Sequence, residues 1–171
     1  AQPTSGAALG LGVDQVLDGA GCRLHAVSRG EGPLVVLLHG FPDFWYGWRH
    51  QLAALAAAGY HAVALDLRGY NLSERPTRVE DYRLDLLVDD VAAAIRGLGG
   101  HAHAVIGHDW GGVIAWKLSV RAPHTFARLT ALERDKLEEE LTEVRKTIKA
   151  LRALLESRVK DPEALHPVSR Y

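Results

Sequence analysis

Two kinds of apolar pattern alternate along the first part of the chain. Short apolar runs bounded by Gly or Pro, at 34–38, 61–65 and 104–106, have the composition of strands buried on both faces of a sheet. Between these runs, residues 48–58 and 84–98 have the length and apolar spacing of helices. Strands and helices in this alternation are typical of a parallel α/β sheet with right-handed crossovers.

The start of the chain predicts a β-hairpin. Two short stretches at 13–17 and 23–28 flank Asp18-Gly19-Ala20-Gly21, and a Gly-bearing turn between two such stretches is typical of a hairpin. Residues 1–12 are small, polar and rich in Gly, which predicts a flexible lead-in. The hairpin is therefore expected to precede the parallel strands.

The pattern changes after Gly112, the last glycine of the chain. From Leu132 to Lys160 the sequence consists mainly of Glu, Lys, Arg, Leu and Ala, with apolar residues at steps of four and three. These apolar residues are Leu137, Leu141, Val144, Ile148, Leu151 and Leu155. The spacing is a heptad seam, so we expect one continuous amphipathic helix from Leu132 to Lys160. Residues 133–160 of this helix are expected to form a segment of their own. The seam predicts a homo-oligomer, and residues 161–171 after it are expected to form an irregular tail.

Composition excludes several classes of function. The chain has 171 residues, 47% of them hydrophobic, and a formal net charge of -1, which indicates a soluble globular domain of unknown compartment. Its apolar runs are far shorter than the roughly 20 residues that cross a bilayer, so no membrane association is expected. The charge balance gives no sign of nucleic-acid binding. The single cysteine, Cys22, and the unpaired histidine spacing lead us to expect neither a metal nor another cofactor.

The strongest chemical signal is Gly107-His108-Asp109-Trp110-Gly111. This spacing, directly after an apolar strand and before a predicted helix, is that of a nucleophile elbow, in which the flanking glycines allow a sharp turn. An aspartate in the nucleophile position implies carboxylate attack on carbon and an alkyl-ester intermediate, as suits an epoxide or an alkyl halide. We expect Asp109 in a strained turn at the carboxyl end of the third parallel strand. The alternative is that Asp109 only caps the following helix.

The loop after the first parallel strand, His39-Gly40-Phe41-Pro42, is expected to provide half of an oxyanion hole. The predicted donors are the backbone amides of Phe41 and Trp110. The remaining residues of the predicted substrate loop are His39, Gly40, Pro42 and His108. Together these residues surround the predicted nucleophile.

Three blocks of the sequence, at 39–51, 66–73 and 107–112, resemble the soluble epoxide hydrolases of the α/β-hydrolase superfamily in order and spacing. The resemblance covers about residues 13–132 and implies a partial α/β-hydrolase fold, with a hairpin, parallel strands and crossover helices, followed by the long heptad helix. The related haloalkane dehalogenases share an Asp followed by Trp, but their loop after His-Gly differs. An epoxide is therefore favoured over an alkyl halide as the small-molecule substrate.

Complete members of that family continue with a helical cap, which carries two tyrosines, and with strands that supply an acid and a His base. None of these can be carried over to this sequence, because the tyrosines of this sequence do not lie in a cap segment. His166, the only histidine beyond His124, lacks the Gly-His context of the family base. We therefore expect a truncated domain with an Asp nucleophile that is unable to complete hydrolysis. The alternative is a non-catalytic module that self-associates through the heptad helix.

Residues 128–141 resemble a different family, the A subunits of DNA gyrase and topoisomerase IV, at the entrance to their coiled-coil arm. Residues 128–132 would also serve as the next strand of the hydrolase fold. The junction lies where two families look alike, which suggests a chimera. The DNA-cleaving tyrosine of topoisomerases lies upstream of this arm, so Tyr171 inherits no such role.

Overall fold

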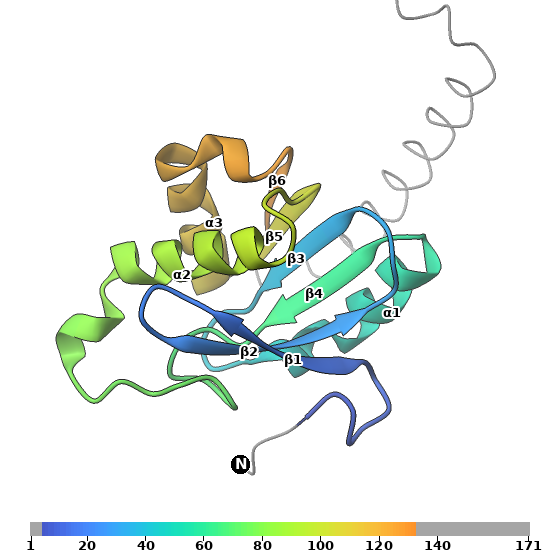
Figure 1. The fold of residues 1–171 in the computed structure, drawn as a ribbon, viewed down its shortest axis with the longest axis horizontal. Coiled ribbons are helices and arrows are strands. Elements are labelled where there is room, and N and C mark those ends of the chain that lie inside the picture. Colours follow the sequence, from blue (N-terminus) through green and yellow to red (C-terminus); the bar gives the residue numbers. More distant parts are fainter. Residues whose placement is uncertain (1–4, 133–171) are drawn as a thin grey trace, which may run out of the picture. The chain divides into compact units, whose positions relative to one another are not determined.

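The structure, a computed structural model, describes residues 5–132 of the chain. Six strands in these residues form one mixed sheet with the order β1-β2-β4-β3-β5-β6 (Figure 1). The strands are β1 Val13–Asp18, β2 Arg23–Arg29, β3 Leu34–Leu38, β4 His61–Leu65, β5 Ala104–His108 and β6 Leu129–Leu132. The strands expected from the sequence thus belong to one sheet in the described residues.

The predicted hairpin is confirmed at β1 and β2, which pair antiparallel with Val13 opposite Ser28 and Asp18 opposite Arg23. Its turn is closed by the Gly19 amide, which donates to the Cys22 carbonyl at 2.8 Å. Strand β2 also pairs antiparallel with β4, so the hairpin extends the parallel part of the sheet. This pairing brings residues of β1 and β2 close to the carboxyl end of β4.

The other four strands run parallel, in the order β4-β3-β5-β6. All five side chains of β3 are buried, as are four of the five in β4, which confirms the prediction of strands covered on both faces. Strand β6 confirms a further strand within residues 128–132, although it begins at Leu129. Because the carboxyl ends of parallel strands meet at one edge, the loops after β3, β4 and β5 come together there.

Helices cover both faces of the sheet (Figure 1). They are α1 Arg49–Ala57, α2 Leu84–Gly97 and α3 Trp110–Arg121, with single 3-10 turns η1 Trp45–Trp48, η2 Val79–Tyr82 and η3 Pro123–Thr125. Helices α2 and α3 pack together on the face that carries Val36, Leu38, Val63 and Val105, whereas α1 packs on β4 and β2. This three-layer arrangement buries both sides of the sheet.

The helix predicted over 48–58 is wrong at its start, because the 3-10 turn η1 takes in Trp48 and α1 begins at Arg49. Both tryptophans of η1, Trp45 and Trp48, are buried, so the chain tightens where these large side chains enter the core. The loop after β3 therefore ends in a packed turn.

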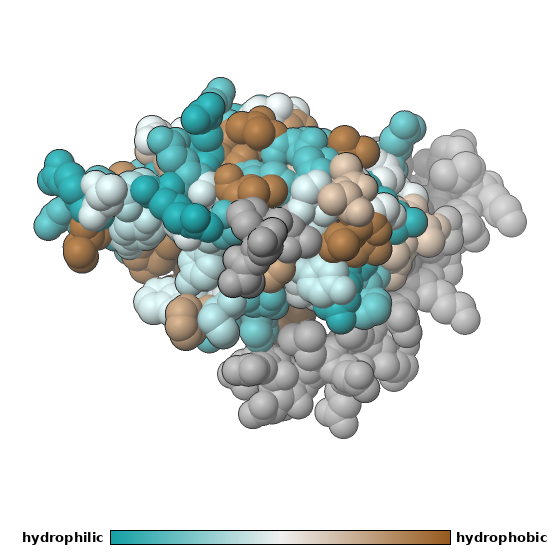
Figure 2. Space-filling view, turned by 90° about the horizontal axis from the view of Figure 1, so that it is seen from below, coloured by the Kyte–Doolittle hydropathy of each residue, from teal (hydrophilic) through white to brown (hydrophobic). Residues whose placement is uncertain are grey.

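One surface feature belongs to α3, whose outward side carries exposed apolar residues. These are Trp110, Val113, Trp116 and Val120. On the face shown in Figure 2, apolar residues lie in several separate patches between polar ones. Within residues 5–132, no helix has the length and apolarity needed to span a bilayer.

Three further predictions concern residues near the two ends of the chain. Residues 5–11, in the predicted lead-in, form a turn in which the amides of Gly6 and Ala7 donate to the Asp14 carboxylate at 2.8 and 2.9 Å. Leu132 is the last residue of β6, so the prediction that a helix begins there is wrong. The predicted helix at 133–160, its seam and the tail at 161–171 lie outside the described residues, and self-association stays a prediction.

Candidate active site

Asp109 lies in the turn between β5 and α3, with φ 51° and ψ -119°. A positive φ is rare for residues other than Gly and is stored strain that the surrounding structure must maintain. The side chain is exposed and makes no capping hydrogen bond to α3. The turn therefore has the strand–turn–helix geometry of an elbow, whereas the role of Asp109 as a nucleophile stays a prediction.

Two glycines allow this turn to approach the end of β3. A Cβ atom on Gly107 would collide with the carbonyl of Gly111, and one on Gly111 would collide with the carbonyl of Leu38. Neither neighbour can move easily, because both are backbone atoms. The glycines thus let the elbow pack directly against the loop that follows β3.

The loop after β3 contacts Asp109 through its backbone. The Phe41 amide donates to the Oδ2 atom of Asp109 at 2.9 Å. A Cβ atom on Gly40 would collide with the Asp109 side chain, so only glycine permits this close approach. The Asp43 amide closes the loop by donating to the Gly40 carbonyl at 3.0 Å, and the Phe41-Pro42 peptide bond is cis.

His39 is buried and links two loops rather than facing solvent. Its Nδ1 atom lies 2.9 Å from the Gly40 carbonyl, and its Nε2 atom lies 3.0 Å from the Leu67 amide. A carbonyl can only accept and an amide can only donate, so His39 carries its proton on Nδ1 and is neutral. Burial lowers the pKa of His39, which agrees with this state.

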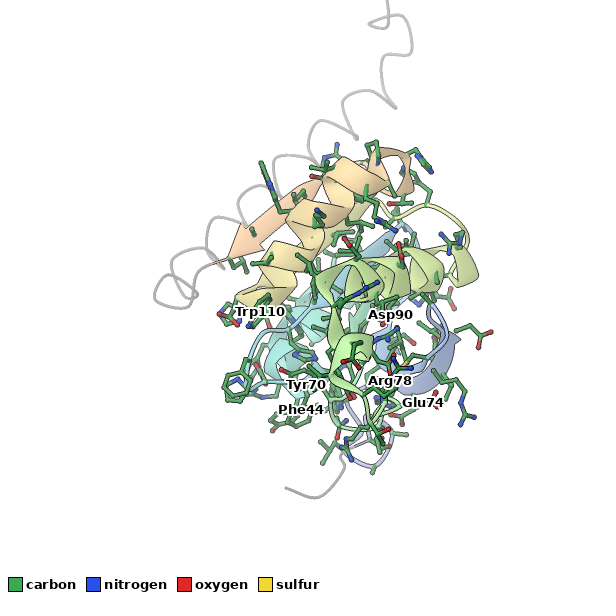
Figure 3. The ribbon with its side chains drawn as sticks, turned by 90° about the vertical axis from the view of Figure 1, so that its left-hand side faces the viewer. Phe44, Tyr70, Glu74, Arg78, Asp90 and Trp110 are labelled. Carbon is green, nitrogen blue, oxygen red and sulfur yellow. The ribbon has the colours of Figure 1, made fainter. Side chains whose placement is uncertain are left out.

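Tyr70 lies over this link, with its ring edge-on to His39 at a centroid distance of 4.7 Å. Burial and the nearby charge of Asp109 both raise the pKa of Tyr70. Tyr70 follows β4 and Trp110 follows β5, so both belong to the carboxyl edge of the parallel strands (Figure 3). No role for Tyr70 was predicted from the sequence, although Tyr70 lies in the second resemblance block, residues 66–73.

The structure thus brings Gly40 and Phe41 against Asp109, as the sequence predicts. His108 ends β5, and its buried Nε2 atom has no hydrogen-bond partner within the part of the chain that the structure describes. Pro42 is exposed beside Phe41, and Trp110 opens α3 next to Asp109. A donor role for the Trp110 amide and substrate contacts of Pro42 and His108 stay predictions.

Asp66 is a further residue that the sequence analysis did not assign. It is fully buried directly after β4 and accepts the amide of Trp45 at 2.8 Å through Oδ1. Its Oδ2 atom lies 2.7 Å from both the His25 ring and the Asn71 side-chain amide. The available signal was a carboxylate directly after a buried strand, because such a group must find partners inside the protein.

Comparison with known proteins gives the family. The sequence profile described as alpha/beta hydrolase fold matches residues 33–163. The chain belongs to the alpha/beta hydrolase fold family. The matched range includes the elbow, the loop after β3 and residues beyond those that the structure describes.

Several relatives are similar over the same part of the chain. The AB hydrolase superfamily protein YfhM of Bacillus subtilis is 47% identical over 120 residues, which are 69% of this chain and 42% of that protein. Mouse epoxide hydrolase 4 is 47% identical over 66% of this chain and 32% of its own length. Epoxide hydrolase B of Mycobacterium tuberculosis is 44% identical over 70% of this chain and 35% of its own length.

Solved structures of epoxide hydrolases are also similar to this chain. An epoxide hydrolase from an endophytic Streptomyces has a TM-score of 0.68 and 46% identity over 71% of this chain and 37% of its own. The epoxide hydrolase VrEH1 from Vigna radiata has a TM-score of 0.67 and 40% identity over 69% of this chain and 38% of its own. The chain spans well under half the length of the relatives it matches. It therefore contains an epoxide-hydrolase-like α/β-hydrolase half-domain.

A metal ion would need several ligating side chains close together. Among residues 5–132, no three His, Cys, Asp or Glu side chains are grouped to hold a metal ion. The expectation of a site without a metal or cofactor stays a prediction. The resemblance of residues 128–141 to the topoisomerase arm also stays a prediction.

Proposed function

We propose that this half-domain uses Asp109 as a nucleophile toward the ring carbon of an epoxide. The observation that carries the proposal is the hydrogen bond of 2.9 Å from the Phe41 amide to Oδ2 of Asp109, at a residue with positive φ. This contact orients the carboxylate relative to the loop after β3. A strained turn is energetically costly, and such strain is concentrated at functional sites.

The proposed reaction has two steps. In the first, Oδ1 of Asp109 forms an ester bond to the epoxide carbon, the ring carbon–oxygen bond breaks, and the ring oxygen takes a proton from an acid. The second step needs a base, which we predict this chain does not supply. The base would take a proton from a water, the water oxygen would attack Cγ, and negative charge would develop on Oδ2. The Cγ–Oδ1 bond would then break, and the released alcohol oxygen would take the proton back from the base. The amide of Phe41, joined by that of Trp110, would stabilise the charge on Oδ2.

The choice of an epoxide rests on the relatives, several of which are named epoxide hydrolases. The Asp nucleophile by itself is equally compatible with an alkyl halide, since both substrates present carbon to a carboxylate. Parallel incubation with one compound of each class separates these two substrates.

The test is alkylation of Asp109 by a reactive epoxide. We expect mass spectrometry of the treated 171-residue chain to show one adduct, located on the peptide that contains Asp109. The adduct should be absent in Asp109→Asn, because the amide is a far poorer nucleophile than the carboxylate. Asp43→Asn is the matched control, since Asp43 is a half-buried carboxylate in the adjacent loop. Equal labelling of Asp109→Asn and the wild type would refute the proposal.

Gly40 provides a second test. The variant Gly40→Ala is expected to slow formation of the adduct on Asp109 by about 10²-fold, because the added Cβ must push the Phe41 amide away from the carboxylate. The control is Gly97→Ala in α2, where a Cβ would have no neighbour within 4 Å. The rate constant of adduct formation measures the effect. Similar rates in the two variants would show that the close approach of Gly40 is unimportant.

A further inference from the structure

A charged histidine lies buried between two carboxylates near the amino-terminal end of the chain. The Nδ1 atom of His25, in β2, is 2.7 Å from Oδ2 of Asp66, and its Nε2 atom is 2.8 Å from Oδ1 of Asp14 in β1. His25 is only 5% exposed and Asp66 is 0% exposed. With both carboxylates ionised, each can only accept, so both ring nitrogens carry hydrogen and the ring is an imidazolium.

The electrostatic surroundings agree with this protonation state. Burial lowers the pKa of His25, but its hydrogen bonds to Asp66 and Asp14 outweigh burial, and the net pKa is raised. Burial likewise raises the pKa of Asp14, and its hydrogen bonds to Ser5, Ala7, His25 and Gly6 outweigh this and lower it. Asp14 and Asp66 are the charged groups that face the His25 ring, Asp14 from β1 and Asp66 from the position directly after β4.

Asp66 connects this imidazolium to both ends of the loop that carries the Phe41 amide. At the far end of the loop, the Trp45 amide donates to Oδ1 of Asp66 at 2.8 Å. At the near end, the amide of Leu67, the residue after Asp66, donates to the His39 ring at 3.0 Å. The loop between His39 and Trp45 is therefore fastened at both ends to two consecutive residues.

We propose that the His25 imidazolium is a positioning residue for the oxyanion loop and acts on the Phe41 amide through Asp66. When His25 loses a proton, only one of its two ring nitrogens can still donate a hydrogen bond to the carboxylates of Asp14 and Asp66. Asp66 is then held less firmly in its orientation. The two attachment points at Trp45 and Leu67 then loosen, and the Phe41 amide moves relative to Asp109. This inference rests on the proposed function only for its catalytic meaning, because the coupling itself is measurable without substrate.

The experiment is a pH titration of the full-length, isotope-labelled chain followed by NMR between about pH 6.5 and 9.5, starting at the ordinary histidine pKa. We expect the amide signals of Phe41 and Trp45 to shift with the same midpoint as the His25 ring. Among the titratable groups that adjoin the loop, the pKa of His39 is lowered and that of Tyr70 is raised, so both change outside this range. The variant His25→Gln separates the effect of His25 from that of His108, which also lies near His39. Signals from the core of α2, such as Ala94, should not follow this midpoint.

Two variants and a control make the result decisive. In Asp14→Asn the common midpoint should shift to lower pH, because one of the carboxylates that stabilise the imidazolium is removed. In His25→Gln the transition of Phe41 should be lost, whereas His50→Gln, at an exposed histidine, should leave it unchanged. A purely structural His25 would change all core signals together and leave no separate Phe41 transition.

The outcomes separate the two proposals. A Phe41 amide that does not titrate with His25 in the wild type, or that keeps its transition in His25→Gln, would overturn the positioning role. Absence of an epoxide adduct on Asp109 would overturn the proposed function and leave the coupling between His25 and Phe41 intact.

Discussion

A large excess of a reactive epoxide is expected to alkylate the 171-residue chain about once per molecule, after which the reaction stops. Opening the ring requires a proton donor, and releasing the diol requires an activated water. A positioned acid or base contributes about 10²- to 10⁴-fold each. On the prediction that this chain supplies neither, it should turn over about 10⁴- to 10⁸-fold more slowly than an enzyme that has both. Chromatography of the diol, together with mass spectrometry of the adduct, measures both steps.

A single result would contradict this expectation. Steady production of diol by the purified chain, abolished in Asp109→Asn, would mean that the chain contains its own base. His166 would be the first residue to test, because it is the only histidine after His124. Diol production that persists in Asp109→Asn would instead indicate a contaminating enzyme or uncatalysed hydrolysis.

Replacing Arg68 with Met is expected to lower the free energy of unfolding by about 3 to 5 kcal/mol, because it leaves a buried carboxylate without its partner. The guanidinium of Arg68 binds Asp90 of α2 with two hydrogen bonds, at 2.6 and 2.7 Å, and both side chains are 3% exposed. Arg68 also donates to the carbonyls of Asp81 and Ala20 at 2.7 and 3.2 Å. This one side chain therefore joins α2, η2, the hairpin turn and the loop after β4.

Urea unfolding of Arg68→Met against Arg78→Met tests this prediction. Arg78 pairs with Glu80 at 3.5 Å, but the side chains are 72% and 67% exposed, so its loss should cost no more than about 1 kcal/mol. The double variant Arg68→Met with Asp90→Leu should recover part of the loss, since no buried charge remains unpaired. Equal stability of Arg68→Met and Arg78→Met would show that the buried pair contributes no more than an exposed one.

Local pattern was sufficient to predict most secondary structure in the described residues. The bounds of β3 and β4 agree with the apolar runs, because a strand covered on both faces needs apolar residues at every position and ends where Gly, Pro or a charge begins. The error at Trp48 has a tertiary cause, since the burial of Trp45 and Trp48 produces a 3-10 turn where the helical spacing alone continues.

The candidate site likewise contains residues that the sequence predicted and residues that it did not. The G-x-D-x-G spacing and the loop after β3 are local signals, and they were sufficient to predict that Asp109 and the loop carrying Phe41 meet at one edge of the sheet. Asp14, His25 and Asp66 were not predicted as a group. Each appears in the sequence as an isolated polar residue, 11 and 41 positions apart.

By itself the sequence determined the strands, the helices and the backbone elements around Asp109, because spacing along one segment controls which side chains are buried and where the chain can turn. Only the tertiary structure decided which charges meet. The pairing of β2 with β4 brings His25 beside Asp66, and the packing of α2 on the sheet brings Asp90 to Arg68. Such contacts depend on strand order and layer packing, which are properties of the assembled sheet. The sequence around each residue therefore does not show which partner that residue meets.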